Sequence, residues 1–247
     1  MVLKNLDFIP PVIAHRGSAS RAPENTILAF KAALEDGARW IETDVKLTSD
    51  GVPILMHDDT LDRTTNGKGL VADMMWSDIK NLDAGTWFGA AFGETRVPVL
   101  GELLSLAREA GLRLNLELKP CPGRARATAM VVLIEAAKLW PEAEPVPLIS
   151  SFDIEALSIA AQLHPDWPRG LLLDEWREDW RELVSKTNAT TLNLNVDLLT
   201  PERLLMFRKA QMPVLAYTVN ESMTAQELIK SGVSAVFTDN PAALIKS

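Results

Sequence analysis

Short apolar runs alternate along the chain with longer stretches in which apolar residues recur every three or four positions. The first run, Val12–Ala14, leads into His15-Arg16-Gly17, which predicts a buried strand followed by a glycine turn. Residues 27–34 carry apolar side chains at helical spacing and end at a glycine turn, so a helix should follow. The next stretch, Trp40–Leu47, has the β-branched and aromatic content of a second strand.

The same alternation continues to the C-terminus and predicts a TIM (β/α)8 barrel. Eight parallel strands are expected to begin near Val12, Trp40, Arg113, Leu148, Gly170, Thr191, Val214 and Ala235. Eight strand–helix units in 247 residues match the usual size of this fold. An open doubly wound sheet is the alternative, but no glycine-rich phosphate loop follows the first strand. We therefore predict one barrel domain over residues 1–247.

One predicted helix carries two tryptophans, and a second segment departs from this pattern. A helix carrying Trp176, Trp180 and Leu183 is expected to pack its tryptophans on the barrel wall. Residues 58–97 contain many turn signals and are too long for a plain loop in a compact domain. We predict that they form a small ordered insertion over the C-terminal face of the barrel. Its packing should come from the interspersed aromatic residues Trp76, Trp87, Phe88 and Phe92.

A tight turn links the second strand to another short apolar run, Val52–His57. Four residues, Thr48-Ser49-Asp50-Gly51, are too few for a parallel crossover, so this run should return as the antiparallel arm of a hairpin. Folding the arm back brings His57 level with Glu42 and Asp44 on the strand before it.

Composition narrows the classes of partner. The net charge of −8 argues against nucleic acid and anionic lipid as main partners. With one cysteine, Cys121, no intrachain disulfide can form. No run of about 18 apolar residues predicts a membrane span, and Met1–Pro11 lacks the apolar core of a signal peptide. We expect a cytoplasmic protein that acts on a small molecule; its oligomeric state is left open.

Three acids should meet at the C-terminal ends of adjacent strands, where TIM barrels place their sites. Glu42 and Asp44 are two residues apart on one strand and share a face, and Glu117 ends the neighbouring strand. Clustered carboxylates resist ionisation unless a cation lies between them. All-oxygen ligation suits Mg²⁺ or Ca²⁺ better than zinc. The alternative for any one acid is a salt bridge to Arg16 or Lys119.

Cationic and imidazole side chains surround the acids. Arg16 and Lys119 are suited to binding phosphate oxygens, although both could instead pair with the acids. His15 and His57 could transfer protons on either side of a phosphorus atom; the alternative is two core histidines without a chemical role. These residues together predict metal-assisted hydrolysis of a phosphoryl group or a phosphodiester.

The chain resembles the glycerophosphodiester phosphodiesterase family in a series of ordered motifs. These are His15-Arg16-Gly17, Pro23-Glu24-Asn25-Thr26, Glu42-x-Asp44, His57-Asp58, Leu61-x-Arg63-Thr64-Thr65-x-Gly67, Glu117-x-Lys119 and Thr238-Asp239-x-Pro241. The segment from Arg169 to Arg177 also resembles cytoplasmic bacterial members linked to glycerol-phosphate uptake.

The resemblance implies hydrolysis of glycerophosphodiesters, such as glycerophosphocholine and glycerophosphoethanolamine, to sn-glycerol 3-phosphate and an alcohol. It implies one Mg²⁺ or Ca²⁺ ion on Glu42, Asp44 and Glu117. His15 and His57 would be the acid–base pair, and Arg16 and Lys119 would hold the phosphate. Whether a cyclic intermediate forms, and which histidine is the acid, stay open.

Two aromatic residues at predicted strand ends, Phe152 and Tyr217, are weaker candidates for the substrate pocket. Tyr217 stands where the family often has tryptophan, which should alter the fit of the head group. Two other functions remain: a phospholipase acting on intact lipid, which the acidic composition disfavours, and a barrel that binds glycerophosphodiesters without cleaving them.

Overall fold

Eight parallel strands close into a barrel in the computed structural model, which describes residues 9–140 and 146–245. Residues 1–8, which include most of the stretch used to judge a signal peptide, lie outside the described part. The strands are β1 (Val12–His15), β2 (Trp40–Leu47), β4 (Arg113–Leu118), β5 (Leu148–Ser151), β6 (Arg169–Leu173), β7 (Thr191–Asn195), β8 (Val214–Tyr217) and β9 (Ala235–Thr238). Each pairs with its neighbours in chain order, and β1 closes the ring by pairing with both β9 and β2.

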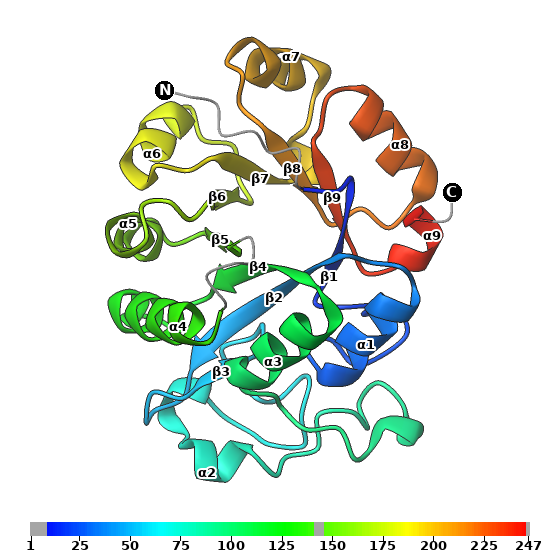
Figure 1. Ribbon diagram of the computed structural model, residues 1–247, viewed down its shortest axis with the longest axis vertical. Helices are drawn as coiled ribbons and strands as arrows, with labels where there is room; N and C mark the ends of the chain where they lie inside the picture. Colours follow the sequence, from blue (N-terminus) through cyan, green and yellow to red (C-terminus); the bar gives the residue numbers. More distant parts are fainter. Residues whose placement is uncertain (1–8, 141–145, 246–247) are drawn as a thin grey trace.

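Helices surround this barrel on its outside (Figure 1). They are α1 (Ile27–Glu35), α3 (Leu100–Ala110), α4 (Ala125–Leu139), α5 (Ile154–Leu163), α6 (Trp180–Thr187), α7 (Pro201–Lys209), α8 (Ser222–Lys230) and α9 (Pro241–Ile245). Threonine side chains cap the N-termini of two of these helices. Thr26 accepts a hydrogen bond from the Ala29 amide at α1, and Thr200 accepts one from the Arg203 amide at α7. The predicted TIM barrel is thus confirmed.

One helix begins later than the sequence predicts. Trp176 precedes α6 and lies outside it, so the four-residue spacing to Trp180 is not helical. Both rings nevertheless contact Phe207 of α7, with centroids 6.2 and 5.1 Å away. The packing role of the two tryptophans was predicted correctly, but one of them reaches the wall from a loop.

The hairpin after β2 forms as predicted. Strand β3 (Pro53–Leu55) runs antiparallel to β2, with Leu55 opposite Val45, and the Met56 amide donates to the Asp44 carbonyl. All eight residues of β2 are buried, because β2 lies between β1 and β4 in the barrel and also carries this extra arm. The arm brings His57 beside the acid-bearing part of β2.

Residues 58–97 extend from the end of β3 and run beside α1 and α3 (Figure 1). They contain only short helices, namely η1 (Val71–Asp73), α2 (Trp76–Ile79) and η2 (Ala90–Phe92). Their core is aliphatic rather than aromatic, with Leu61, Val71 and Ile79 buried against Ile54 of β3. The predicted aromatic packing is confirmed only for Trp76, which is partly buried against this cluster. Trp87, Phe88 and Phe92 instead form edge-to-face contacts with one another.

Within residues 9–140 and 146–245, no helix combines the length and the apolar character needed to cross a membrane.

Candidate active site

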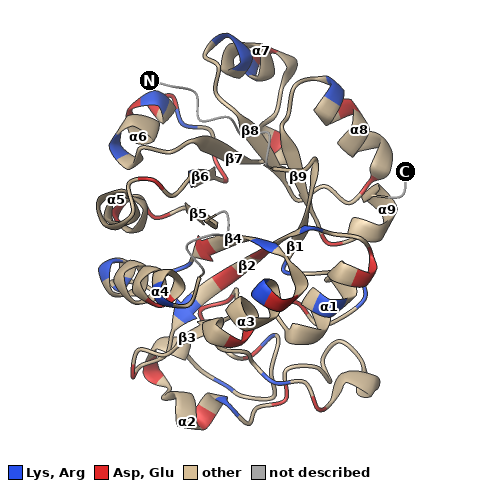
Figure 2. Cartoon of the chain, in the orientation of Figure 1, with Lys and Arg blue, Asp and Glu red and all other residues tan. Residues whose placement is uncertain are grey.

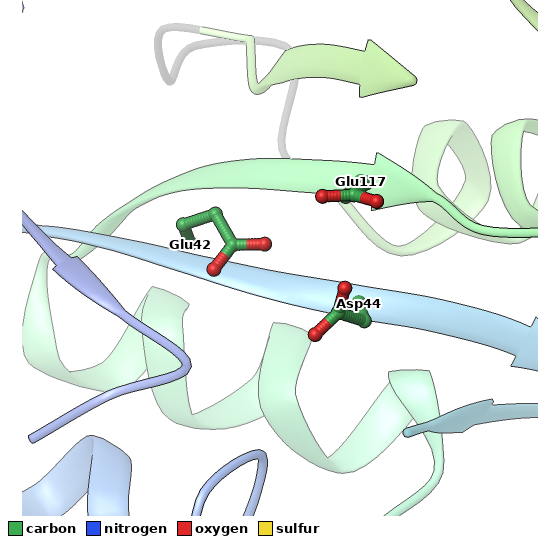
Figure 3. A group of neighbouring side chains, drawn as sticks. All are labelled: Glu42, Asp44 and Glu117. Carbon is green, nitrogen blue, oxygen red and sulfur yellow. The ribbon is translucent and has the colours of Figure 1, made fainter. Parts of the chain in front are cut away.

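Three carboxylates converge where β2 and β4 run side by side, as Figure 3 shows. Glu42 and Asp44 project from the same face of β2, and Glu117 projects from β4, where it lies opposite Asp44 in the strand register. One ligand oxygen of each residue lies within 4.8 Å of the others, and all three side chains are buried. The three acids predicted to meet therefore do so, because parallel pairing brings the ends of β2 and β4 together.

Burial and mutual repulsion act strongly on two of these acids. Burial, Asp44 and Glu117 together raise the pKa of Glu42 well above its usual range. Burial and Asp44 raise the pKa of Glu117 to about 7. Burial would do the same to Asp44, but Arg16, Lys119 and His57 outweigh it and hold the pKa of Asp44 below its usual range. The neighbouring protein cations therefore outweigh burial at Asp44 but not at Glu42 or Glu117.

The cluster fits a hard divalent cation. The buried Oε1 atom of Glu42 has no hydrogen-bond partner within the described part of the chain, although buried carboxylate oxygens are normally paired. A cation among the three carboxylates would satisfy this atom and stabilise the ionised forms of Glu42 and Glu117. Oxygen donors alone are the chemistry that Mg²⁺ and Ca²⁺ prefer.

Arg16 and Lys119 lie against these acids. Nε of Arg16 is 3.2 Å from Asp44, and the Arg16 backbone amide donates to Glu42 at 3.1 Å. Nζ of Lys119 is 2.9 Å from Glu117 and 3.4 Å from Asp44. The salt bridges considered as the alternative thus exist for Asp44 and Glu117. Both cations also line the cavity described below, so they can contact an anion in it.

Each histidine has a carboxylate on its Nδ1 atom. His15 Nδ1 lies 2.7 Å from Asp239, and His57 Nδ1 lies 2.8 Å from Asp58. Such a contact fixes the ring orientation and favours a proton on Nδ1, which leaves Nε2 free to accept one. Burial lowers the pKa of His57, although Asp44 partly offsets that effect.

A cavity of about 410 Å³ joins these groups. Its lining includes eight of the nine predicted site residues: His15, Arg16, Glu42, His57, Glu117, Lys119, Phe152 and Tyr217. The ninth, Asp44, lies beneath them in the carboxylate cluster. Phe152 and Tyr217 meet edge to face at 6.0 Å and form an aromatic wall, and Lys119 lies 5.3 Å from the Phe152 ring centroid.

Acidic and basic side chains gather at the carboxylate cluster on β2 and β4. Figure 2 shows acidic positions on β2 and β4, while other charged positions lie on the outer helices and along the loops, including those of the segment 58–97. Within the site, Asp44 is held by Arg16, Lys119 and the Asn25 amide, which donates to it at 2.9 Å. The barrel interior thus contains a dense cluster of acids and cations at one end.

The sequence prediction omitted several supporting residues. Asp239 and Asp58 hold the histidines, and Asn25 donates to Asp44 while it also accepts from Thr43. Glu24 contacts Arg16 at 2.8 Å. All four occur in the motifs that carried the family resemblance, so the signal was present without an assignment of role.

Comparisons with known proteins agree with one another. Residues 15–243 match the family model of the glycerophosphoryl diester phosphodiesterase family. A glycerophosphodiester phosphodiesterase from Caldanaerobacter subterraneus subsp. tengcongensis is 37% identical over 238 residues, which cover 95% of this chain and 96% of the relative. One from Bacillus subtilis is 32% identical over 248 residues, covering 93% and 83%.

The chain is also similar to solved structures of phosphodiesterases. A phosphodiesterase from Oleispira antarctica, in complex with the product sn-glycerol-3-phosphate, superposes with a TM-score of 0.94 at 36% identity. The match covers 98% of this chain and 97% of that one. A protein from Silicibacter pomeroyi described as a glycerophosphoryl diester phosphodiesterase gives 0.84 at 28% identity, with 96% and 92% covered.

Proposed function

Because the chain belongs to the glycerophosphoryl diester phosphodiesterase family, we propose that it cleaves glycerophosphodiesters to sn-glycerol 3-phosphate and an alcohol by metal-assisted histidine acid–base catalysis. The observation that carries this proposal is the cavity in which a buried three-carboxylate cluster adjoins two cations and two histidines. The product bound by the Oleispira antarctica relative supports the glycerol 3-phosphate half of the substrate.

In this proposal Glu42, Asp44 and Glu117 hold one divalent cation, Mg²⁺ or Ca²⁺. The ion, when bound, would supply positive charge that draws electron density from a phosphate oxygen. Arg16 and Lys119 bind the other phosphate oxygens. Both are fixed by ion pairs with Asp44 or Glu117, so they require little reorganisation as negative charge grows in the transition state.

His15 and His57 transfer the protons. Because Asp239 and Asp58 engage the two Nδ1 atoms, Nε2 is the reactive nitrogen in each ring. One histidine accepts a proton from the attacking water or glycerol hydroxyl, and the other donates one to the departing alkoxide. Attack by water gives glycerol 3-phosphate directly, whereas attack by the hydroxyl gives a cyclic phosphodiester that water must then open. The attached carboxylates stabilise whichever ring becomes positively charged.

The aromatic wall of Phe152 and Tyr217 is proposed to contact the organic part of the substrate. Tyr217 donates its hydroxyl hydrogen to the Leu173 carbonyl at 2.8 Å, so the ring is held in place. Glycerophosphocholine and glycerophosphoethanolamine are the proposed substrates, and a cytoplasmic location stays a prediction of the sequence.

A coupled assay tests the proposal. Glycerol 3-phosphate released from glycerophosphocholine is oxidised by glycerol-3-phosphate dehydrogenase, and product formation is followed by NADH absorbance. We expect activity that disappears with EDTA and returns with Mg²⁺ or Ca²⁺. His15→Ala and His57→Ala should each reduce turnover by about 10²–10⁴-fold. Equal activity before and after metal removal would refute the metal role, and near-normal turnover of either variant would remove that histidine from the mechanism.

A further inference from the structure

Arg63, in the segment 58–97, makes two forked ion pairs with residues from different parts of the chain. Its Nε and Nη2 atoms donate to Asp58 at 2.7 and 2.9 Å. Its Nη1 and Nη2 atoms donate to Glu24 at 2.7 and 2.8 Å. One planar guanidinium thus joins the loop after β3 to the turn before α1, which a single lysine ammonium could not do with the same geometry.

Both acids in this arrangement contact a proposed site residue. Oδ1 of Asp58 contacts both Nη2 of Arg63 and Nδ1 of His57, the latter at 2.8 Å. Glu24 uses Oε1 to accept from Nη1 of Arg16 at 2.8 Å. Arg63 itself does not line the cavity, so it is placed to act on the site through these two carboxylates.

Loss of Arg63 would disturb both contacts. Glu24 is only 13% exposed and would keep Arg16 as its one remaining cation, so the guanidinium of Arg16 would be drawn more strongly away from Asp44. Asp58 would lose the two donors that fix its plane, and the His57 ring would lose its orientation with it. The low pKa values of Asp58 and Glu24, to which Arg63 contributes in both cases, agree with carboxylates that stay ionised in these contacts.

We propose that Arg63 is a positioning residue that sets the orientation of His57 through Asp58 and of Arg16 through Glu24 at the same time. The inference rests on the proposed function, since it assigns proton transfer to His57 and phosphate binding to Arg16. It gives the segment 58–97 an indirect part in the chemistry, through Asp58 and Glu24. It also couples two halves of the site that approach the substrate from different strands.

Two kinetic effects should appear together in Arg63→Ala. Misorientation of His57 lowers kcat, and displacement of Arg16 raises KM and weakens competitive inhibition by glycerol 3-phosphate. We expect kcat to fall about 10- to 100-fold, a fraction of the effect of removing a general acid–base group. KM should rise about three- to tenfold. Arg63→Lys keeps the charge without the double fork, so it should recover KM more than kcat.

Arg21→Ala is the matched control. Arg21 is as exposed as Arg63, at 46% against 44%, and also pairs with two acids, Glu35 and Asp36. Like Arg63 it does not line the cavity, but its acids contact Ser18 and Arg21 rather than a proposed site residue. It should lose a comparable amount of thermal stability while kcat and KM stay within twofold of the wild type. Millimolar guanidinium ion, added back to Arg63→Ala, should restore part of kcat and should not affect Arg21→Ala.

The outcomes separate the two proposals. A folded wild-type protein that releases no glycerol 3-phosphate would refute the proposed function. An active wild type with an equally active, folded Arg63→Ala would refute the positioning role alone. That role is also overturned if Arg63→Ala loses activity only in proportion to its loss of folded protein and guanidinium restores nothing. A combined change in kcat and KM that guanidinium partly reverses would support it.

Discussion

His15 on β1 and Asp239, which follows β9, lie 2.7 Å apart through Nδ1 and Oδ1, although 224 residues separate them in the chain. Asp239 is itself fixed by the Asn220 side-chain amide, which donates to its other oxygen at 2.9 Å. The contact exists because β1 and β9 are neighbours where the barrel closes. The last strand of the barrel therefore orients a histidine on the first.

Asp239→Asn should lower turnover by about tenfold or more, because the amide no longer favours a proton on Nδ1 or stabilises a positively charged ring. KM should change little, since Asp239 is not among the residues that line the cavity. The measurement is kcat and KM for release of glycerol 3-phosphate. Asp179→Asn, at an exposed acid paired with Arg177, is the control. Turnover equal to that of the control would show that His15 needs no such partner.

Glu42→Gln should abolish stabilisation by metal. At a concentration 100 times Kd, a ligand that binds only the folded state adds about 2.7 kcal/mol, or roughly 5–10 °C in Tm for a chain of this size. We expect Mg²⁺ or Ca²⁺ to raise the Tm of the wild type by such an amount and to leave the variant unchanged. In EDTA the variant should be at least as stable as the wild type, because a buried carboxyl group with one unpartnered oxygen has been removed.

Glu135→Gln, at a partly buried acid on α4, serves as the control and should keep the full metal response. A variant Glu42→Gln that gains as much in Tm as the wild type would place the ion elsewhere.

The sequence was sufficient for the barrel because its local signals are strong. Glycine turns bound the apolar runs, and eight such runs with intervening helices leave few topologies. The rule that strand ends carry the site then selected the acids and histidines. It could not reveal the contacts between Arg63 and Glu24 or between His15 and Asp239, because residues 39 and 224 positions apart share no periodic pattern.

The predictions that failed, for the start of α6 and for the packing of residues 58–97, both concern side chains whose burial depends on tertiary contacts rather than on local sequence. Trp176 and Trp180 are four residues apart and both reach Phe207, but Asp179 precedes the first turn of α6, so tertiary packing rather than helical periodicity brings them together. In the segment 58–97, aromatic residues were the most conspicuous apolar side chains. The aliphatic residues that pack against Ile54 of β3 are the ones that become buried.

The metal-free protein should lose stability as pH rises, through Glu117. Burial and Asp44 raise its pKa from 4.5 to about 7, so the folded state binds this proton more tightly than the unfolded state. The resulting stabilisation is fully present below pH 4.5 and is lost as the pH rises through 7. A difference of this size corresponds to on the order of 3 kcal/mol.

Urea unfolding in EDTA at pH 5 and pH 8 measures this effect, with Glu117→Gln as the comparison because other carboxylates also titrate. The variant should gain stability relative to the wild type between the two pH values. A stability difference that is the same at both would contradict the raised pKa.

Phe152→Ala should weaken substrate binding more than it slows turnover. The ring packs against Tyr217 and lies 5.3 Å from Nζ of Lys119, a cation–aromatic contact worth about 0.5–1 kcal/mol at partly exposed sites. Removing the ring deletes this contact and opens the cavity wall, so KM for glycerophosphocholine should rise about two- to fivefold with kcat within twofold of the wild type. Phe152→Leu, which keeps an apolar side chain but loses the ring, separates the two contributions. If both variants bind substrate as the wild type does, the Phe152 ring does not contact the substrate.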